Sequence, residues 1–539
     1  MRLPKEQSYE QSIEVFIKKA TKSNKTTILH KIFEVFKNGE ITVEMIGFLL
    51  EKKSDINADC NLGNDIALHL AFEGKKNSFE IIKFLVERKS DLNHTNRLWY
   101  IPLHCALKRK VISIDMVKYL VDSKTNISSL KPKTPNPLFC YLSNKRTTNF
   151  EIVKYLVENS VSVNSKDNLK NLPLHLMLQK ENITLDLVRI MVENKSDLNL
   201  KNNYNNSPVH FGFQNDYISF EIVKYLIENK SDMNSENNFR NTPLHFACGN
   251  NYLSSESLRY LANSCFLELN KANSLGNSPL YYVCGNEKIS LEIVKNFVEN
   301  KSDLNTNNYK NYTALHQACT NQHFSLEIIH YLVENKCDIN ARNSINETPF
   351  DLACSNQNVN LEIIKYFVEN KSCVNSKSKN GSSPFHFICS TKNVSVDMIK
   401  YFIENKSNVL LINENKETPL FFASKNENVA FDVINFLVEK KCSLNLKNIL
   451  QQTPLQLAKK NNNLINNIKK EFGNTDSIEK LFKGVKKNSS QNVKIEIINE
   501  EIKNNDTNEG ENDEKKETNG LNKNKKKDEE LKDKKCFTF

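Results

Sequence analysis

Cysteine and histidine are the residue types in this sequence that could bind a metal, form disulfides or take part in catalysis. The 539 residues include 13 Cys and 11 His. Zinc sites and redox centres commonly use a C-x-x-C pair, and the sequence contains none. Instead, five cysteines recur at intervals of 35 or 36 residues: Cys248, Cys284, Cys319, Cys354 and Cys389.

The even spacing of these cysteines indicates packing. If each interval is one layer of a helical stack, neighbouring cysteines lie about 10 Å apart. A disulfide needs Cα atoms within about 7 Å of each other. Buried free cysteine packs as a small apolar side chain. The sequence therefore predicts five core residues, with no disulfide and no metal site among them.

Histidine follows the same period. Eight of the 11 histidines hold one position of a repeated motif: His30, His69, His104, His175, His210, His245, His316 and His386. A catalytic or metal-binding histidine would interrupt the period. The three that do so are His94, His323 and His330, which have no Cys or carboxylate partner at a recognisable spacing. We interpret these three as surface residues.

Motifs of common enzyme classes are missing from the sequence. It contains no G-x-x-x-x-G-K-[ST], no G-x-G-x-x-G, no H-E-x-x-H and no G-x-S-x-G, the patterns that bind phosphates, dinucleotides and zinc or present a nucleophilic serine. Only 13 Gly occur in the chain, and a repeated unit takes up most of its length. The sequence therefore predicts no enzyme and no cofactor.

The C-terminal sequence KKCFTF carries the one residue whose type suggests a modification. Cys536 is fourth from the end, as in a prenylation box, and a final Phe favours geranylgeranylation. Nearby lysines could add an electrostatic attraction to a membrane: Lys523, Lys525, Lys526, Lys527, Lys532, Lys534 and Lys535. Against this, Thr538 is not aliphatic and Phe537 is bulky. Two alternatives stay open, a lipidated Cys536 and an accidental cysteine.

The repeated unit positions all of these residues. Its first helix is expected to start at Ile28, Ala67, Pro102, Pro137, Pro173, Pro208, Pro243, Pro279, Ala314, Pro349, Pro384, Pro419 and Pro454. After a first step of 39 residues, the spacing is 35 or 36 every time. Thirteen units at a fixed period indicate a stacked repeat array, in which each unit covers the apolar face of the next.

Each unit carries signals for two helices. In the first, Thr242 is a favourable N-cap and Pro243 suits the first helical position. Apolar residues at helical spacing follow, as in Leu244, Ala247 and Cys248. The second helix opens with a hydroxyl cap and an acid in its first turn, which suit the positive helix N-terminus, as in Ser325–Glu327. The spacing thus predicts a helix-turn-helix unit.

The motif Thr-Pro-Leu-His-x-Ala, followed by Glu-Ile-Val-Lys-x-Leu-Val-Glu and Asp-x-Asn, resembles the ankyrin repeat over about residues 27–470. The resemblance implies an all-α solenoid of stacked helix-turn-helix units with finger loops, in which the motif histidine supports a turn by hydrogen bonding. Two features depart from the family. The period is 35–36 instead of about 33, and Lys, as at Lys301 and Lys371, replaces the Gly that ends the second helix, so a different cap is expected there.

The ends of the chain differ from the repeats. We expect residues 1–26 and an amphipathic helix over 471–487 to cap the array, although a membrane-surface role for the second remains an alternative. Residues 488–535 are polar and charged and should be disordered, and 536–539 form the candidate prenylation box. Residues 475–535 hold fifteen Lys and fifteen Asp or Glu, so the net charge of +10 is spread over the repeats. That is too dilute for nucleic-acid binding.

The resemblance implies that a protein partner binds the concave surface formed by the fingers and the first helices. Exposed aromatic and basic finger residues are candidate anchors, with ordinary solvated positions as the alternative: Tyr204, Phe239, Arg240, Tyr309, Lys310, Tyr312, Arg342, Lys377 and Lys379. The leading hypothesis is a non-catalytic scaffold or adaptor, which Cys536 could tether to a membrane. The alternatives are a mechanical spacer, or a regulatory subunit of a signalling or ubiquitin-ligase complex.

Location follows from what the sequence lacks. No apolar run approaches the roughly 20 residues of a membrane span, and residues 1–19 lack the apolar core of a signal peptide. We expect a cytoplasmic protein, which would be peripheral on the cytoplasmic face of a membrane if Cys536 is prenylated.

Overall fold

The computed structural model describes residues 28–35, 41–51, 54–59, 63–73, 79–127, 134–143, 148–264, 267–323 and 325–466. All of them belong to the first of two compact units, Met1–Asn467 and Ile468–Phe539. The expected caps at 1–26 and 471–487, the tail at 488–535 and the candidate lipidation site Cys536 lie outside the described residues, as do the boundaries at 26/27 and 470/471.

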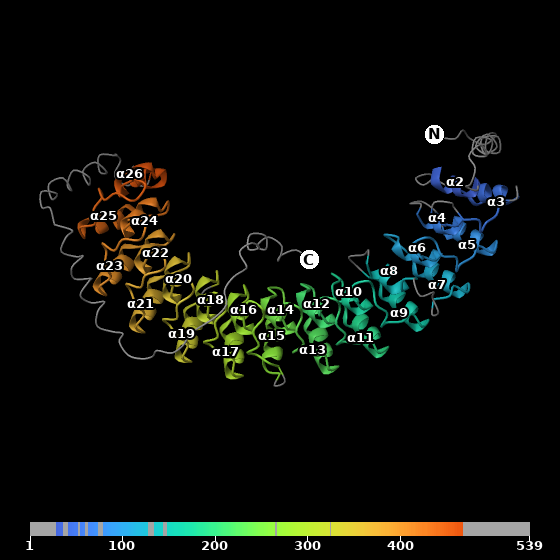
Figure 1. Ribbon diagram of the computed structural model, residues 1–539, viewed down its shortest axis with the longest axis horizontal. Helices are drawn as coiled ribbons and strands as arrows, with labels where there is room; N and C mark the ends of the chain where they lie inside the picture. The colour runs from blue at the N-terminus through green and yellow to red at the C-terminus, as the bar shows by residue number, and fades with distance from the viewer. Residues whose placement is uncertain are drawn as a thin grey trace, which may run out of the picture. The chain divides into compact units, whose positions relative to one another are not determined.

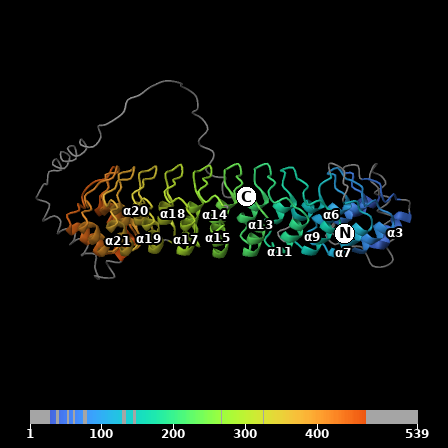
Figure 2. The ribbon, with the colours of Figure 1, turned by 90° about the horizontal axis from the view of Figure 1, so that it is seen from below.

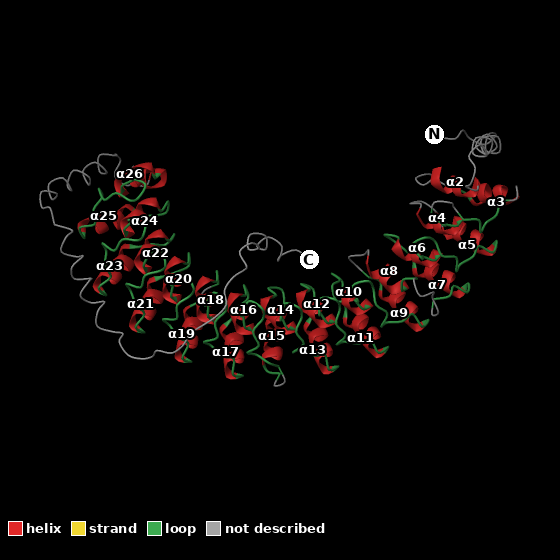
Figure 3. Ribbon diagram, viewed as in Figure 1, coloured by secondary structure: helices red, strands yellow, loops and turns green. Residues whose placement is uncertain are grey.

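The described residues form helices joined by loops, with no strand among them (Figures 1 and 3). The first helices of the units are α2 (Ile28–Val35), α4 (Ala67–Glu73), α6 (Pro102–Lys108), α8 (Pro137–Ser143), α10 (Pro173–Met177), α12 (Pro208–Gln214), α14 (Pro243–Gly249), α16 (Pro279–Gly285), α18 (Ala314–Thr320), α20 (Pro349–Ser355), α22 (Pro384–Ser390), α24 (Pro419–Lys425) and α26 (Pro454–Lys460). Each begins at the residue predicted from the period.

Second helices alternate with the first. They are α3 (Val43–Glu51), α5 (Phe79–Glu87), α7 (Ile114–Asp122), α9 (Phe150–Glu158), α11 (Leu185–Glu193), α13 (Phe220–Glu228), α15 (Ser255–Ala262), α17 (Leu291–Glu299), α19 (Leu326–Glu334), α21 (Leu361–Glu369), α23 (Val396–Glu404) and α25 (Phe431–Glu439). This alternation confirms the predicted all-α array of helix pairs.

Helices pack in two rows along the array. Each first helix packs against the first helix of the next unit, and the second helices do the same. Within 28–466 the first helices line the inner side of the stack and the second helices its outer side (Figure 1). The finger loops between units project together in one direction (Figure 2). The array therefore has an inner face of first helices and fingers, and an outer face of second helices.

Small and aromatic side chains fill the space between layers. Cys248, Cys284 and Cys319 are fully buried and carry free thiols, and burial raises their pKa values. The predicted packing role of these cysteines is confirmed. Towards α22, Phe385 and Phe402 stack with ring centroids 5.3 Å apart, so aromatic packing takes over part of this role.

The helix N-termini are capped largely as the sequence predicts. Ser325 Oγ accepts from the backbone N–H of Ile328 at 3.3 Å, which is the expected second-helix cap. At Thr242 the hydroxyl lies 2.8 Å from His245 Nδ1, and the same nitrogen accepts from Thr242 N–H at 3.1 Å. The histidine ring thus takes part in capping this helix together with the hydroxyl.

Lysine ends the second helices in the left-handed conformation. Lys371 has φ +66°, and Ser372 N–H donates to Phe367 O at 2.9 Å while Lys371 N–H donates to Val368 O at 3.0 Å. These bonds form a Schellman motif, which normally uses Gly at this position. Asn340 Nδ2 of the preceding unit also donates to Lys371 O at 3.2 Å. The prediction of a different cap was wrong: the backbone forms the usual Schellman motif, with Lys in place of Gly.

Buried asparagines tie the ends of the first helices together. Asn321 Nδ2 donates to Cys284 O and to Asn286 O, both at 2.9 Å, and its Oδ1 accepts from His323 N at 2.8 Å. These first-helix asparagines, which each donate to two carbonyls of the preceding unit, are Asn215, Asn250, Asn286, Asn321, Asn356, Asn426 and Asn461. They satisfy carbonyls that a helix end would otherwise leave unpaired.

Candidate interaction surface

The fingers are short hairpins, most of them organised by one asparagine at the base, with Asp167 in this place in one finger. Asn237 Oδ1 accepts from the N–H groups of Phe239 (2.9 Å) and Asn241 (3.0 Å). Its Nδ2 donates to Asn206 Oδ1 in the preceding finger at 2.9 Å. Equivalent donors reach back one finger at Asn202, Asn273 and Asn308. The asparagine that shapes each of these fingers therefore also joins it to its neighbour.

Backbone hydrogen bonds connect the finger tips. Asn238 N–H donates to Tyr204 O at 3.0 Å, Ser274 N–H to Phe239 O at 2.8 Å, and Tyr309 N–H to Leu275 O at 3.0 Å. One such bond links each pair of successive tips in this region. Because the tips are bonded at both base and end, the fingers form a continuous layer.

The motif histidines hold the fingers against the first helices. His316 Nδ1 accepts from Thr313 N–H at 3.1 Å, and its Nε2–H donates to Glu347 O of the next finger at 3.2 Å. This requires a neutral ring with the proton on Nε2. Burial lowers the pKa to about 4 at His104, His175, His210, His245 and His386. The hydrogen-bonding role implied by the resemblance is confirmed.

One unit replaces the histidine with a carboxylic acid. Asp351 is 1% exposed, and its Oδ2 accepts from the N–H and the hydroxyl of Thr348, both at 2.8 Å. Ser376 Oγ donates to the same oxygen at 3.1 Å. Burial raises the pKa of Asp351 to about 6. An ionised carboxylate cannot donate a hydrogen bond to the next finger as the histidine Nε2–H does. The carbonyl that a histidine would reach, Ser382 O, instead accepts from Ser378 Oγ at 2.9 Å.

The candidate anchors lie on the fingers, and most are exposed. Tyr204, Phe239 and Tyr309 are large exposed apolar residues. Tyr312 is half-buried, with its ring 5.4 Å from that of His316. The basic candidates are all exposed: Arg240, Lys310, Arg342, Lys377 and Lys379. Arg240 forms an ion pair of 3.6 Å with Glu236 of its own finger.

Aliphatic residues occupy the same tip positions and escaped the sequence reasoning, which considered only aromatic and basic side chains. Leu169, Leu275 and Ile345 lie two residues after the base residue of their fingers, as Tyr204 and Phe239 do. We define the fingertip ridge as Leu169, Tyr204, Phe239, Leu275, Tyr309 and Ile345. These six residues on six successive fingers are 44–74% exposed. Five of them share one hairpin position, two residues after the base, which was the signal that could have found them; Tyr309 lies one residue after Asn308, beside Lys310 at the shared position.

Aromatic residues on the first helices lie beside the fingers. Phe211, Phe246 and Tyr282 are half-buried on α12, α14 and α16. Each ring packs edge-on against the motif histidine of the preceding unit, with centroids 5.6–6.0 Å apart. These rings extend the apolar character of the inner face below the ridge.

Comparison with protein families assigns this architecture. The chain matches the model for ankyrin repeats (3 copies) over 35–131, 76–167, 139–237, 214–308, 254–343, 286–378 and 350–448. These overlapping segments span most of the described residues. The chain belongs to the ankyrin repeat family. Ankyrin repeats generally mediate protein–protein interactions and are typically not catalytic. No curated protein sequence matches the chain.

The outer face of the ankyrin array carries its own row of half-buried tyrosines and neighbouring basic residues, paired across units. Arg189 lies over the ring of Tyr225, Lys295 over Tyr331, and Lys365 over Tyr401, at 5.5–5.9 Å from the ring centroid. The hydroxyl of Tyr155 bonds to the Asp122 carboxylate of the preceding unit. We call this row of second-helix Lys, Arg and Tyr residues the outer stripe.

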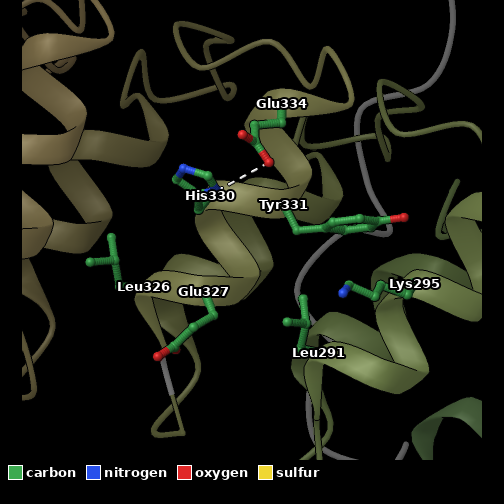
Figure 4. A pocket seen from close by; sticks show the side chains of 7 residues that line it. All are labelled: Leu291, Lys295, Leu326, Glu327, His330, Tyr331 and Glu334. Carbon is green, nitrogen blue, oxygen red and sulfur yellow. Dashed lines mark ion pairs between the residues drawn. The ribbon is translucent and has the colours of Figure 1, made fainter.

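A shallow hollow lies between α17 and α19 on this face (Figure 4). Its lining consists of Leu291, Lys295, Leu326, Glu327, His330, Tyr331 and Glu334. The charged groups are engaged with neighbours: His330 Nδ1 is 3.1 Å from Glu334, and Lys295 covers Tyr331. The hollow is a gap between paired side chains and presents no converging set of free polar groups.

Two further features are absent from the described residues. No cluster of three or more His, Cys, Asp or Glu there could hold a metal ion. None of the helices in 28–466 that the structure describes is both long and apolar enough to cross a membrane.

Proposed function

We propose that this ankyrin array is a non-catalytic scaffold or adaptor that binds a protein partner along its fingers and inner face. The observation that carries the proposal is the fingertip ridge. Six large apolar side chains, one on each of six successive fingers, are 44–74% exposed. Large apolar side chains exposed in a row along one edge support this role, because interaction sites expose more apolar surface than the rest of a soluble protein.

The hydrogen bonds of the fingers support the proposal through preorganisation. A binding loop that must become ordered loses part of its binding free energy to that ordering. Here Asn237 fixes the finger that presents Phe239, and the bond from Ser274 N–H to Phe239 O fixes its tip to the next. The ridge is therefore presented without a large ordering cost.

Affinity capture from a eukaryotic cell lysate, with mass spectrometry, tests the proposal. We expect a set of proteins that the wild-type chain captures to be lost with Phe239→Ser combined with Tyr309→Ser. The matched control is Tyr217→Ser combined with Tyr252→Ser, which removes two equally exposed tyrosines from the turns between first and second helices. The control should keep the captured set.

The result also separates the adaptor from its alternatives. A captured set that both variants retain would contradict binding at the fingers, and no specific capture at all would favour a mechanical spacer. The identities of lost proteins would show whether the chain serves a signalling or a ubiquitin-ligase complex. Ridge-dependent capture is thus the result that the adaptor requires.

Membrane tethering through Cys536 is a separate part of the proposal and rests on the C-terminal sequence. Intact mass measurement and membrane fractionation, beside a Cys536→Ser variant, test it. A prenyl mass with loss of residues 537–539, and a soluble variant, would establish a membrane-tethered adaptor. An unmodified, soluble wild type would contradict the tether and leave the finger proposal intact.

A further inference from the structure

The spacing of the fingertip ridge is set by the hydrogen bonds of the fingers. Within one finger, Asn237 N–H donates to Asn241 O at 3.0 Å, which joins the two arms of the hairpin. Between fingers, Ser274 N–H donates to Phe239 O at 2.8 Å. One finger-to-finger step therefore contains two strand separations of about 4.8 Å each, or about 10 Å in total. The helices beneath, which pack 8–10 Å apart in proteins generally, impose the same step.

A partner that uses every finger must present an apolar side chain about every 10 Å on one side. In a β-strand, three residues cover about 10 Å, but residues i and i+3 point to opposite faces. A polyproline II segment has three residues per turn and a rise of about 3.1 Å, so residues i and i+3 share a face about 9 Å apart. The polyproline II repeat thus matches the ridge.

An α-helix matches the spacing but not the width of the ridge. Residues i and i+7 lie about 10.5 Å apart, yet an amphipathic helix has an apolar stripe at least about 100° wide. Five of the six ridge residues form a single row; in the remaining finger Lys310 holds the row position and Tyr309 lies next to it. The row is flanked by polar residues such as Asn203, Asn238 and Ser274 on one side and by Lys170 and Arg240 on the other. A helix would press its remaining apolar residues against these polar groups.

Charge in the six fingers indicates the chemistry of the partner. Residues 166–171, 201–206, 236–241, 271–277, 307–312 and 342–347 contain seven Lys or Arg against three Asp or Glu. The three acids are engaged locally. Asp167 accepts from Asn171 N at 2.8 Å, Glu236 pairs with Arg240 and Lys271, and Glu347 accepts from Asn343 Nδ2 at 3.2 Å. The surface beside the ridge is therefore basic.

A second copy of the chain fits this charge poorly. Two ridges facing each other would bring like-charged lysines and arginines together, which is unfavourable. Acidic residues at the intervening positions of a peptide would instead lie opposite the exposed Lys170, Lys310 and Arg342. Charge complementarity thus favours an acidic partner in trans.

We infer that the partner presents an acidic segment in the polyproline II conformation, with a bulky apolar residue at every third position, along the fingertip ridge. A segment of about 16 residues would place one apolar side chain on each of the six fingers, at three residues per turn. This inference rests on the proposed function and specifies the class of partner that the fingers accept.

Fluorescence anisotropy with labelled synthetic peptides tests the inference on the full chain. The probe is (Leu-Glu-Pro)6. The matched peptides are (Leu-Lys-Pro)6, which reverses the charge, (Leu-Glu-Pro-Glu)5, which changes the period, and an acidic amphipathic helix with heptad spacing. We expect the probe to bind at least tenfold more tightly than each of the three, and less tightly as salt increases.

Variants of the chain locate the binding. Phe239→Ser combined with Tyr309→Ser should weaken probe binding at least tenfold, and Tyr217→Ser combined with Tyr252→Ser should not. Circular dichroism confirms that both remain folded, as expected for exposed side chains. Equal affinity for the period-four or helical peptide, or for the lysine peptide, would overturn the inference.

The inference and the proposed function can fail separately. If no peptide binds but protein capture from lysate still depends on the ridge, the partner is not a polyproline II segment and the adaptor proposal holds. If the wild type is a dimer by light scattering and the ridge variant is a monomer, a second copy occupies the ridge and the inference is wrong. If neither peptide binding nor capture depends on the ridge, both proposals fail.

Discussion

The fingertip ridge and the outer stripe are two rows of large side chains that run along the same array; the ridge residues are exposed, whereas the outer-stripe tyrosines are half-buried. In the outer stripe, Lys365 lies over the ring of Tyr401, and the Tyr155 hydroxyl bonds to Asp122, so each unit engages the next. On the ridge, Phe239 and Tyr309 are joined to their neighbours through backbone atoms, and their side chains remain exposed. The side chains of the outer stripe contact neighbouring units of the array, whereas the side chains of the ridge are exposed to solvent.

The difference shows that residue type does not by itself identify a binding surface. Aromatic and basic residues are enriched in interface hot spots, and both rows contain them. What separates the rows is whether the side chains already have partners within the array. The pairing across units assigns the outer stripe to stability and leaves the ridge for binding.

Acidification should have the largest effect on stability, and it should act on the finger layer and not on the outer stripe. Lowered histidine pKa values favour folding above the unfolded pKa of about 6.5, and this contribution is lost as pH falls towards the folded value of about 4. At pH 5 each such histidine should contribute about 2 kcal/mol less stability than at neutral pH. Urea denaturation at pH 7.5 and pH 5 measures the change.

The finger layer should weaken first in acid, because the histidines hold it to the first helices. The outer stripe should not respond, since burial raises the pKa of Tyr225 and Tyr401 above 10. Asp351 works in the opposite direction, because its raised pKa of about 6 favours folding below pH 4 and opposes it above pH 6. An unchanged midpoint between pH 7.5 and pH 5 would contradict neutral histidines.

Removing one tyrosine from each row tests the comparison directly. Tyr225→Ala should lower the free energy of unfolding by about 1 kcal/mol, because it removes a partly buried ring and its contact with Arg189. Tyr309→Ala should change stability by less than about 0.5 kcal/mol, as at most exposed positions. Chemical denaturation of both variants provides the measurement. Equal losses would mean that the ridge also serves the stack.

Glycine in place of a helix-ending lysine should stabilise the outer face slightly. Lys371 adopts φ +66°, a conformation that is strained for residues with a Cβ and open to Gly. Lys371→Gly should therefore raise the free energy of unfolding, by up to about 1 kcal/mol, in part offset by the greater entropy of Gly in the unfolded chain. A thermal melt beside Lys377→Gly, a change at an exposed finger position, provides the control.

Two lysine-to-glutamine substitutions, one in each row, should have the smallest effects on stability and binding and should contrast the two rows most directly. Lys295→Gln removes a cation over the Tyr331 ring and should cost about 0.5 kcal/mol of stability, with no effect on binding of the (Leu-Glu-Pro)6 probe. Lys310→Gln should leave stability unchanged and weaken that binding two- to fivefold. The reverse pattern, with a binding loss only for Lys295→Gln, would exchange the roles of the two rows.

The period made the fold predictable. Pro243 and its equivalents marked every first helix, and Ser325 and its equivalents capped the second, because helix starts have strong local signals. The packing role of Cys248 also followed from its position in the repeat. The turn-supporting role of His316 followed from the resemblance to the ankyrin family.

The parts that could not be predicted depend on atoms far apart in sequence. Asn321 bridges to carbonyls of Cys284 and Asn286, and nothing local distinguishes such an asparagine from one in a solvated loop. Lys371 in a left-handed conformation was missed because residue type argued against it. Leu275 was missed because a single exposed leucine is ordinary. It became informative when the structure placed it at the same finger position as Leu169, Tyr204, Phe239 and Ile345.

The first-helix asparagines also restrict how such a gene can change. Asn321 reaches back 37 residues to Cys284 and 35 to Asn286, and Asn356 repeats both intervals to Cys319 and Asn321. Asn286 makes the equivalent bonds to Cys248 O and Asn250 O across 38 and 36 residues, so a unit can accommodate one additional residue. Loss of a complete unit would bring the next asparagine into the vacated place. Lineages carrying this chain should therefore differ by whole repeats gained or lost, and by no more than about one codon in the length of a unit between successive asparagines.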